Sequence, residues 1–189
     1  MKKLLFLSLL VVSVMLVGAP ARADLVAVSA DAVLNYDYNH AGDVSNINAS
    51  GYKVGVSVPI FFVGLGYETY TVKSKLQQKP PLNSIGFESD VTMFDVFADV
   101  PFPFLNLTVG AGVGKATFAG YDEFNGSQVV AADDASMKQV FFTVGYPFLG
   151  IFDVHLGYHS ISGKATQQGG GGEFDLGASM LTLGMRVGF

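Results

Sequence analysis

Ionisable side chains recur at every second position of several segments whose alternate positions are apolar. The residues in such positions are Asp31, Lys53, Glu68, Asp95, Asp99, Asp153, His155, His159 and Arg186. Because residues two apart on a β-strand point to the same face, this spacing places them together, opposite the apolar face. Charges removed from water must be paired or hydrated. The set therefore predicts either a network of ion pairs around Lys53 and Arg186 or a narrow, cation-preferring water path lined by the excess carboxylates.

Two histidines in this set raise the question of metal binding or catalysis. His155 and His159 lie four residues apart, which on a strand separates them by about 13 Å, too far for one metal ion to bind both. Ser160 and Ser162 follow His159 at odd spacings, so alternation turns both hydroxyls away from the imidazole that would activate them. The chain has no cysteine to act as a nucleophile or metal ligand. We expect no metal site, no cofactor and no catalytic activity.

Eight segments of alternating polarity would position these residues. They span about 25–38, 51–58, 63–68, 94–100, 105–114, 140–145, 152–159 and 181–189. On the first segment, Tyr36 falls on the apolar face, whereas Asn35 and Asp37 fall on the polar one. Alternate glycines on the fifth segment, from Gly110 to Gly114, would relieve crowding inside a narrow barrel.

The connections between these segments alternate between short and long. Three short ones, at 59–62, 101–104 and 146–152, are rich in Pro and aromatic residues; four long polar ones cover about 38–50, 73–90, 118–136 and 160–175. Charged residues of the second and third long connections include Lys73, Lys75, Lys79, Asp122, Glu123, Asp133 and Asp134. In loops, such groups are either simply solvated or bind phosphates and divalent cations at a nearby surface.

The start of the chain has the features of an export signal. Lys2 and Lys3 precede an apolar run over 4–18, and small residues then flank Arg22, so we expect cleavage after Ala23. The alternative, a retained membrane anchor, conflicts with the shortness of the run and with the cleavage site that follows it. The predicted organisation is a signal peptide, 1–23, and one barrel domain, 24–189.

The composition agrees with a sheet that has one apolar face. Half of the residues are hydrophobic, yet no later stretch reaches the roughly 18 to 20 continuous apolar residues of a membrane-spanning helix. A sheet within hydrocarbon must close on itself, since each unpaired backbone group at an open edge would cost several kcal/mol. The formal net charge of −5 argues against a nucleic-acid partner. A soluble lipocalin-like barrel or a sandwich is the alternative, but it leaves the asymmetry of the connections unexplained.

The last segment carries an apolar stripe that ends at Phe189. Its members are Leu181, Leu183, Met185, Val187 and Phe189. With the export signal, the eight segments and the alternating connections, this stripe resembles the closing strand of small bacterial outer membrane β-barrels, the class of the outer membrane protein A membrane domain and outer membrane protein X. The resemblance implies an all-β fold, a closed eight-stranded antiparallel up-and-down barrel in the Gram-negative outer membrane, with periplasmic termini and extracellular loops.

The same resemblance implies partners and candidate functions. Leu183, Met185, Val187 and Phe189 would form the signal read by the barrel insertion machinery. Periplasmic chaperones, outer membrane lipid and lipopolysaccharide would be further partners, and we expect a monomer. The expected role is surface interaction or envelope structure through the loops, and the alternative is a porin-like narrow channel for ions or small solutes. A lipid A-modifying enzyme is less favoured, because such deacylases place a His and a Ser two apart, which His159 and Ser160 do not match.

Overall fold

The protein is described here from a computed structural model. The structure describes residues 25–38, 45–60, 62–77, 85–102, 104–122, 128–148, 152–166 and 173–189. The predicted signal peptide, 1–23, lies outside the described residues. Within the described part there is no helix with the length and hydropathy needed to cross a lipid bilayer.

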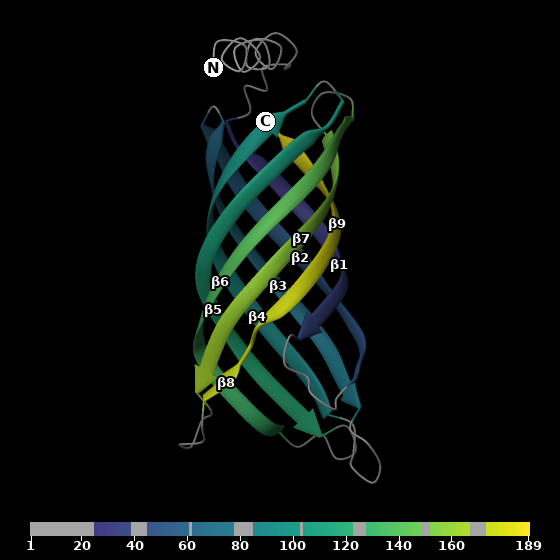
Figure 1. Cartoon of the computed structure of the whole chain (residues 1–189), viewed down its shortest axis with the longest axis vertical. Helices are drawn as coiled ribbons and strands as arrows, with labels where there is room; N and C mark the ends of the chain where they lie inside the picture. The colour runs from purple at the N-terminus through teal and green to yellow at the C-terminus, as the bar shows by residue number, and fades with distance from the viewer. Residues whose placement is uncertain are drawn as a thin grey trace, which may run out of the picture.

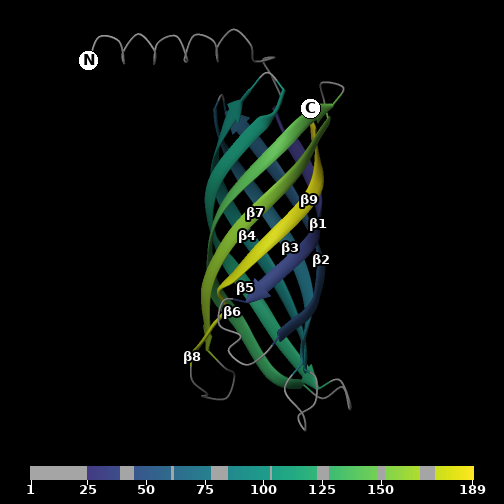
Figure 2. The same ribbon diagram turned by 45° about the vertical axis from the view of Figure 1, so that its right-hand side comes forward.

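The described residues form a closed antiparallel β-barrel, which confirms the predicted fold class. The strands are β1 (Ala27–Tyr38), β2 (Ser45–Ile60), β3 (Val63–Gln77), β4 (Ile85–Pro101), β5 (Asn106–Asp122), β6 (Gln128–Phe148), β7 (Phe152–Thr166), β8 (Glu173–Asp175) and β9 (Ala178–Gly188). Each strand pairs with the next from β1 to β7, β7 pairs with β9, and β9 pairs with β1, so the ring contains eight strands. The short β8 pairs only with the far end of β7. Figures 1 and 2 show the strands tilted steeply around one long barrel.

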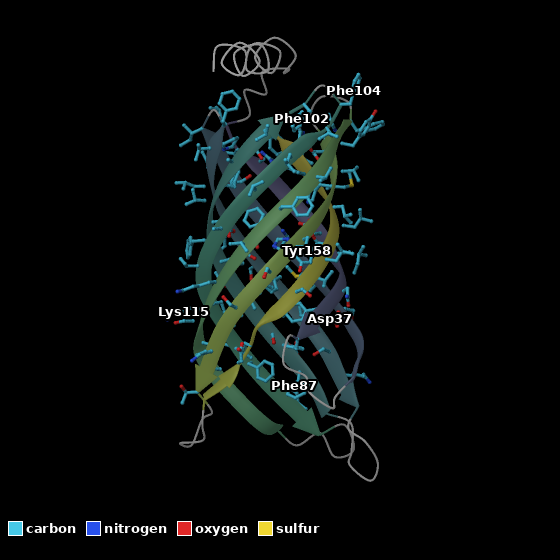
Figure 3. All side chains as sticks on the ribbon, viewed as in Figure 1. Asp37, Phe87, Phe102, Phe104, Lys115 and Tyr158 are labelled. Carbon is cyan, nitrogen blue, oxygen red and sulfur yellow. The ribbon has the colours of Figure 1, made fainter. Side chains whose placement is uncertain are left out.

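The two ends of the described chain close the ring at the same end of the barrel. Ala27 lies opposite Gly188, and the Leu25 amide donates a hydrogen bond to the Phe189 carbonyl over 2.7 Å. The three short connections lie at this end too, as predicted. Exposed aromatic side chains lie there as well, among them Phe62, just before β3, and Phe104 (Figure 3). We call it the terminal end, and the other the distal end. Closure therefore gives each of the eight ring strands a paired neighbour on both sides.

Alternation places the side chains as the sequence indicates on all strands but one. Outward positions near the terminal end carry the apolar residues, and the inward positions there carry the ionisable ones. On β1 the register with β9 shifts between Val33 and Asn35, which marks a β-bulge. The bulge turns Tyr36 into the interior, where it is 2 % exposed, and turns Asn35 and Asp37 outward. The predicted faces of these three residues were therefore wrong.

The strands extend well beyond the predicted segments at the distal end. The connection predicted over 73–90 is strand through Gln77 and again from Ile85, and that predicted over 118–136 is strand through Asp122 and again from Gln128. The predicted long loops are therefore largely barrel wall. Period-two alternation continues through these residues, but the apolar residues now face inward and the polar residues face outward. Because of this exchange, the residues resemble irregular polar sequence.

Candidate functional site

The barrel interior near the terminal end gathers the nine ionisable residues singled out in the sequence. All nine face inward, from six different strands. Seven of them are buried: Asp31, Lys53, Glu68, Asp95, Asp153, His155 and His159. Asp99 and Arg186 are half-buried closer to the terminal end. The spacing of these residues thus brings charged groups from strands far apart in sequence into one enclosed space.

Lys53 lies at the centre of this group. Its Nζ donates to Glu68 Oε2 over 3.1 Å and lies 3.7 Å from Asp31 Oδ2. It also lies 3.5 Å from His159 Nε2, which must accept because an ammonium can only donate. The Nδ1–H of His159 then donates to Gln139 Oε1 over 3.2 Å. The Lys53 contacts therefore fix the tautomer of His159 and the orientation of Gln139.

Gln139 extends this network to a third carboxylate. Its Nε2 donates to Glu68 Oε1 and to Asp95 Oδ1, both over 2.7 Å. An amide nitrogen has two protons to donate, so both are used. The sequence did not mark Gln139, because an uncharged polar residue between Lys138 and Val140 gives no distinctive signal. In the structure it is 3 % exposed and joins β3, β4 and β7 through one side chain.

His155 lies between two further carboxylates. Its Nε2 is 2.6 Å from Asp31 Oδ1, and its Nδ1 is 3.9 Å from Asp153 Oδ1. Asn106 donates to the other oxygen of Asp153 over 2.5 Å. Asp31 thus contacts both His155 and Lys53, so that the two groups of charges form one continuous network.

A second pair closes the interior toward the terminal end. Both terminal nitrogens of Arg186 lie near Asp99 Oδ2, at 3.3 and 3.4 Å, and the Thr108 hydroxyl donates to the other Asp99 oxygen. The guanidinium carbon of Arg186 is 6.0 Å from the centre of the Phe97 ring, within the range of a cation–π contact. A cavity of about 90 Å³ lies between this pair and the Lys53 network. Its size and polar lining suit a few water molecules.

Inward glycines make room for the largest interior side chains. A Cβ atom on Gly184 would overlap the Asp31 carboxylate, and one on Gly112 would overlap that of Asp95. A Cβ on Gly114 would overlap the backbone carbonyl of Thr92 as well as the sulfur of Met93. The predicted role of the fifth segment's glycines is therefore confirmed: each lies beneath a neighbour's side chain.

Toward the distal end the interior changes from polar to apolar. The inward residues there pack as one hydrophobic cluster: Val33, Tyr36, Tyr70, Val72, Val91, Met93, Ala116, Phe118, Ala135, Met137, Ile161, Ala165, Leu176, Ala178 and Met180. Three of its large members, Tyr36, Tyr70 and Met93, are at most 2 % exposed. We call this cluster the apolar plug. Sequence reasoning missed it because, apart from Val33 and Tyr36, these residues lie in the predicted loops or between those loops and the predicted strand segments.

At the same level along the barrel, the outer surface changes from apolar to polar toward the distal end. On β3 the inward change falls between Glu68 and Tyr70, and the outward change from apolar to polar falls between Tyr67 and Thr69. Every long strand for which both faces are described behaves alike. The last apolar and first polar outward residues are Leu34 and Asn35, Tyr67 and Thr69, Phe94 and Thr92, Val113 and Lys115, Val140 and Lys138, Tyr158 and Ser160, and Leu181 and Ser179. We call this common position the polarity inversion.

Beyond the inversion the outer surface is polar and charged. Lys73 donates to Glu88 over 2.9 Å, and Thr71 donates to Asp90 over 2.5 Å. The hydrogen bond to Glu88 and the charge of its carboxylate raise the pKa of Lys73 above its ordinary value. In Figure 3, Lys115 and Asp37 lie on the distal side of Tyr158, as the inversion requires.

Catalytic and metal chemistry can be judged from the placement of the candidate residues. His159 is fully buried in the interior, whereas Ser160 and Ser162 are exposed on the outer surface, so neither hydroxyl faces the imidazole. Within the described residues, no group of three or more His, Asp or Glu side chains is arranged to hold a metal ion.

Comparison with known proteins supports the fold. No protein-family model and no curated protein matches the chain. Among solved structures, Neisserial surface protein A is similar with a TM-score of 0.64 and 15 % identity, over 87 % of this chain and 97 % of that one. OprG of Pseudomonas aeruginosa is similar with a TM-score of 0.53 and 11 % identity, over 89 % and 97 %. The N-terminal barrel of P. aeruginosa OprF gives 0.51 and 13 %, over 86 % and 97 %. At these identities the similarity shows the fold: that of the small outer membrane β-barrels.

Proposed function

We propose that the chain is an integral outer membrane barrel that does not conduct and that acts at the cell surface, in surface interaction or envelope structure. Its termini lie in the periplasm, and the distal end projects from the membrane. The polarity inversion is the single observation that carries this proposal. On the terminal side the wall is apolar outside and polar inside, which suits hydrocarbon; on the distal side it is polar outside and apolar inside, which suits water.

The length of the apolar outer band supports a membrane-spanning role. On β2 the outward apolar residues run from Tyr52 to Ile60, and on β9 from Leu181 to Phe189. A transmembrane strand needs roughly 9 to 11 residues. The band therefore matches the hydrocarbon layer, and the strand residues beyond it extend past the membrane as a rigid wall.

The two ends of the barrel support the proposed direction in the membrane. The connections at the terminal end are short, and the wall there ends where the apolar band ends. In outer membrane barrels the short turns are periplasmic and the longer elements are extracellular. This assignment places the projecting wall and the distal connections outside the cell. NspA, the similar neisserial barrel, is named a surface protein, in agreement with this direction.

One observation favours the narrow-channel alternative, and a stronger observation argues against it. The interior carries more carboxylates than cations, which favours cation entry from the terminal end. However, the apolar plug fills the distal interior with buried rings and methionine side chains, and Tyr36 and Tyr70 are among them. An ion would have to shed its water to pass such a segment, at a cost of several kcal/mol or more. We therefore assign the charged network a structural role.

Single-channel recording tests the proposal. Residues 24–189 would be refolded, checked by the heat-dependent gel shift of a folded barrel, and inserted into planar bilayers beside a porin as positive control. We expect no conductance steps from the folded barrel. Stable cation-selective steps that change with Asp95→Asn would contradict the proposal and establish the channel instead.

A further inference from the structure

Asp95 differs from the other carboxylates of the barrel interior, because it has no cationic partner. Each of the other four lies within ion-pair distance of a basic side chain: Asp31 and Glu68 of Lys53, Asp153 of His155, and Asp99 of Arg186. Asp95 forms no ion pair with a described residue, and Gln139 is the one donor among them to its side chain. Asp95 is nevertheless only 5 % exposed. An isolated carboxylate is costly to bury, so its charge needs a partner that these residues do not supply.

Glu68 makes a negative charge on Asp95 still less favourable. Gln139 Nε2 donates over 2.7 Å to both Asp95 Oδ1 and Glu68 Oε1, so the two carboxyl groups lie within two hydrogen-bond lengths of each other. Glu68 is the one that keeps its charge, because Lys53 donates to its other oxygen over 3.1 Å. Where two carboxyl groups share one buried site, a proton on one of them removes their repulsion. The geometry favours Asp95 as the carboxyl group that holds it.

The remaining charged groups of the interior do not compensate for Asp95. They lie on five strands: Asp31 on β1, Lys53 on β2, Asp99 on β4, Asp153, His155 and His159 on β7, and Arg186 on β9. His159 accepts from Lys53 and is therefore neutral, so even with His155 protonated the carboxylates outnumber the cations. The described inward residues of β5 and β6 carry no ionisable group. One carboxyl group can thus hold a proton without leaving a cation unpaired.

The second oxygen of Asp95 lies beside the internal cavity. Oδ2 accepts no hydrogen bond from a described residue, and it lies 3.7 Å from the position that a Cβ atom on Gly66 would take. Asp95 and Gly66 both line the cavity of about 90 Å³, as do the half-buried Thr108 and Thr143. Hydroxyl oxygens and water accept hydrogen bonds, so a proton on Oδ2 has an acceptor in this cavity.

We propose that Asp95 is a proton-binding site, at which the folded barrel holds a neutral carboxylic acid at neutral pH. Oδ1 accepts from Gln139, and the O–H group at Oδ2 donates into the cavity. A metal cation in the cavity fits less well, because Lys53 and Arg186 line the same space and would repel it. The proposal goes beyond the proposed function, since it concerns the interior and holds for either direction of the barrel in the membrane.

The proton makes the stability of the barrel depend on pH. In the unfolded chain Asp95 lies in water and ionises at about pH 4, so unfolding at neutral pH releases the proton. Because the folded state then binds more protons than the unfolded state, the free energy of unfolding falls as the pH rises. The fall ends at the pH at which the folded barrel itself loses the proton. Above that pH two anions share Gln139, and the interior is weakest at this residue.

Infrared spectroscopy of the refolded barrel, residues 24–189 in a detergent without carbonyl groups, tests the inference directly. A protonated carboxyl group has a C=O stretch distinct from the bands of a carboxylate. We expect this band in the wild type at neutral pH and its loss in Asp95→Asn. Asp99→Asn is the matched control and should retain the band, because it removes an inward carboxylate of the same strand that is paired with Arg186. Absence of the band from the folded wild type, or its retention in Asp95→Asn, would overturn the inference.

Urea unfolding across a pH series gives an independent measurement. Above about pH 4, and up to the pH at which the folded barrel loses its proton, the unfolding constant of the wild type relative to that of Asp95→Asn should rise by up to about tenfold per pH unit. The same ratio taken with Asp99→Asn should not rise in this way. A ratio to Asp95→Asn that stays constant across the series would contradict the proton site.

Two further measurements serve if Asp95→Asn does not fold. Glu68→Gln removes the neighbouring anion, so the carboxylic acid band of the folded barrel should disappear at a lower pH than in the wild type, and an unchanged titration would overturn the inference. The wild type should be equally stable in sodium chloride and in choline chloride at one pH. Specific stabilisation by sodium would place a metal cation in the cavity and overturn the inference too.

Discussion

Lys53 shows how single residues hold the interior together. Its neighbours Asp31 and Glu68 are both buried, and His159 and Gln139 complete a network that leaves little room for a different arrangement. Buried ion pairs add little stability compared with apolar packing, but removing one partner leaves the others uncompensated. The effect of Lys53 on stability is therefore measured most clearly by removing it.

Replacing Lys53 with Met should destabilise the barrel strongly. The change leaves Asp31 and Glu68 without their ammonium partner, and the loss of a buried partner costs about 3 to 5 kcal/mol. Urea unfolding in lipid vesicles, followed by the gel shift because the chain has no Trp, measures this cost. The double variant Lys53→Met/Glu68→Gln should recover part of it, since one uncompensated charge is gone. A single variant as stable as the wild type would show that the network is hydrated rather than tightly paired.

Alternation was sufficient to predict that the nine ionisable residues face inward, but not which of them meet. The facing of His155 follows from its spacing to Asp153 on one strand. Its contact with Asp31 joins β7 to β1 across the intervening β9, and depends on how the ring closes and tilts. No local pattern carries that information, which is also why Gln139 was missed.

The glycines act at the level of strand pairs. Gly114 allows β4 and β5 to approach where Thr92 and Met93 lie against it, whereas a Cβ on Gly66 would meet only ordinary contacts with Asp95. Both glycines face inward from regular strand, so they differ mainly in what surrounds them.

Gly114→Ala should therefore destabilise the barrel, and Gly66→Ala should not. Overpacking of this kind costs about 1 to 3 kcal/mol of stability. Ala also restricts the unfolded chain more than Gly does, and this effect offsets part of the cost. The two variants form a matched pair for urea unfolding. Equal stability of both would mean that β4 and β5 separate freely, contrary to the close packing in the structure.

Under the proposed function, each long strand combines a membrane segment and a water-exposed segment in one continuous ladder. On β3 the outward Leu65 lies in the apolar band, the inward Val72 is fully buried in the plug, and the outward Thr71 is in the polar region. The signal for this was present in the sequence as apolar residues moving from odd to even positions after Tyr67. This shift was not recognised because the polar residues at the odd positions were interpreted as loop. On β1 the bulge concealed the inward position of Tyr36 in a similar way.

Lysine substitutions along β3 should follow the inversion. Leu65→Lys places a charge in hydrocarbon and should cost about 2 to 4 kcal/mol, as on the lipid face of other barrels. Val72→Lys buries an unpaired charge in the plug and should be at least as disruptive. Thr71→Lys should change the stability little, because its side chain is in water. Folded yield and urea midpoint would measure the series, and an equal tolerance of Val72→Lys and Thr71→Lys would refute the distal plug.

At the scale of the whole molecule, the strands continue along the barrel without a break in the sheet (Figure 2). The inversion divides this one barrel into two parts of opposite polarity, which the proposed function assigns to the membrane and to a projecting wall. The closed fold and the short terminal connections could be predicted from sequence, since both follow from local alternation and turn composition. The height of the wall could not, because it depends on where the surrounding solvent changes from lipid to water. This change determines which face of a strand must be apolar.

Labelling of single cysteines along β3 tests the inversion most directly. Leu65, Tyr67, Thr69, Thr71 and Lys73 all face outward in succession, and each can be replaced by Cys in a chain that has none. In reconstituted vesicles, an impermeant maleimide should react at 71 and 73 and fail at 65 and 67, with the boundary at 69. An environment-sensitive dye should report hydrocarbon below that boundary and water above it. Uniform protection, or uniform reactivity, along all five positions would contradict the account.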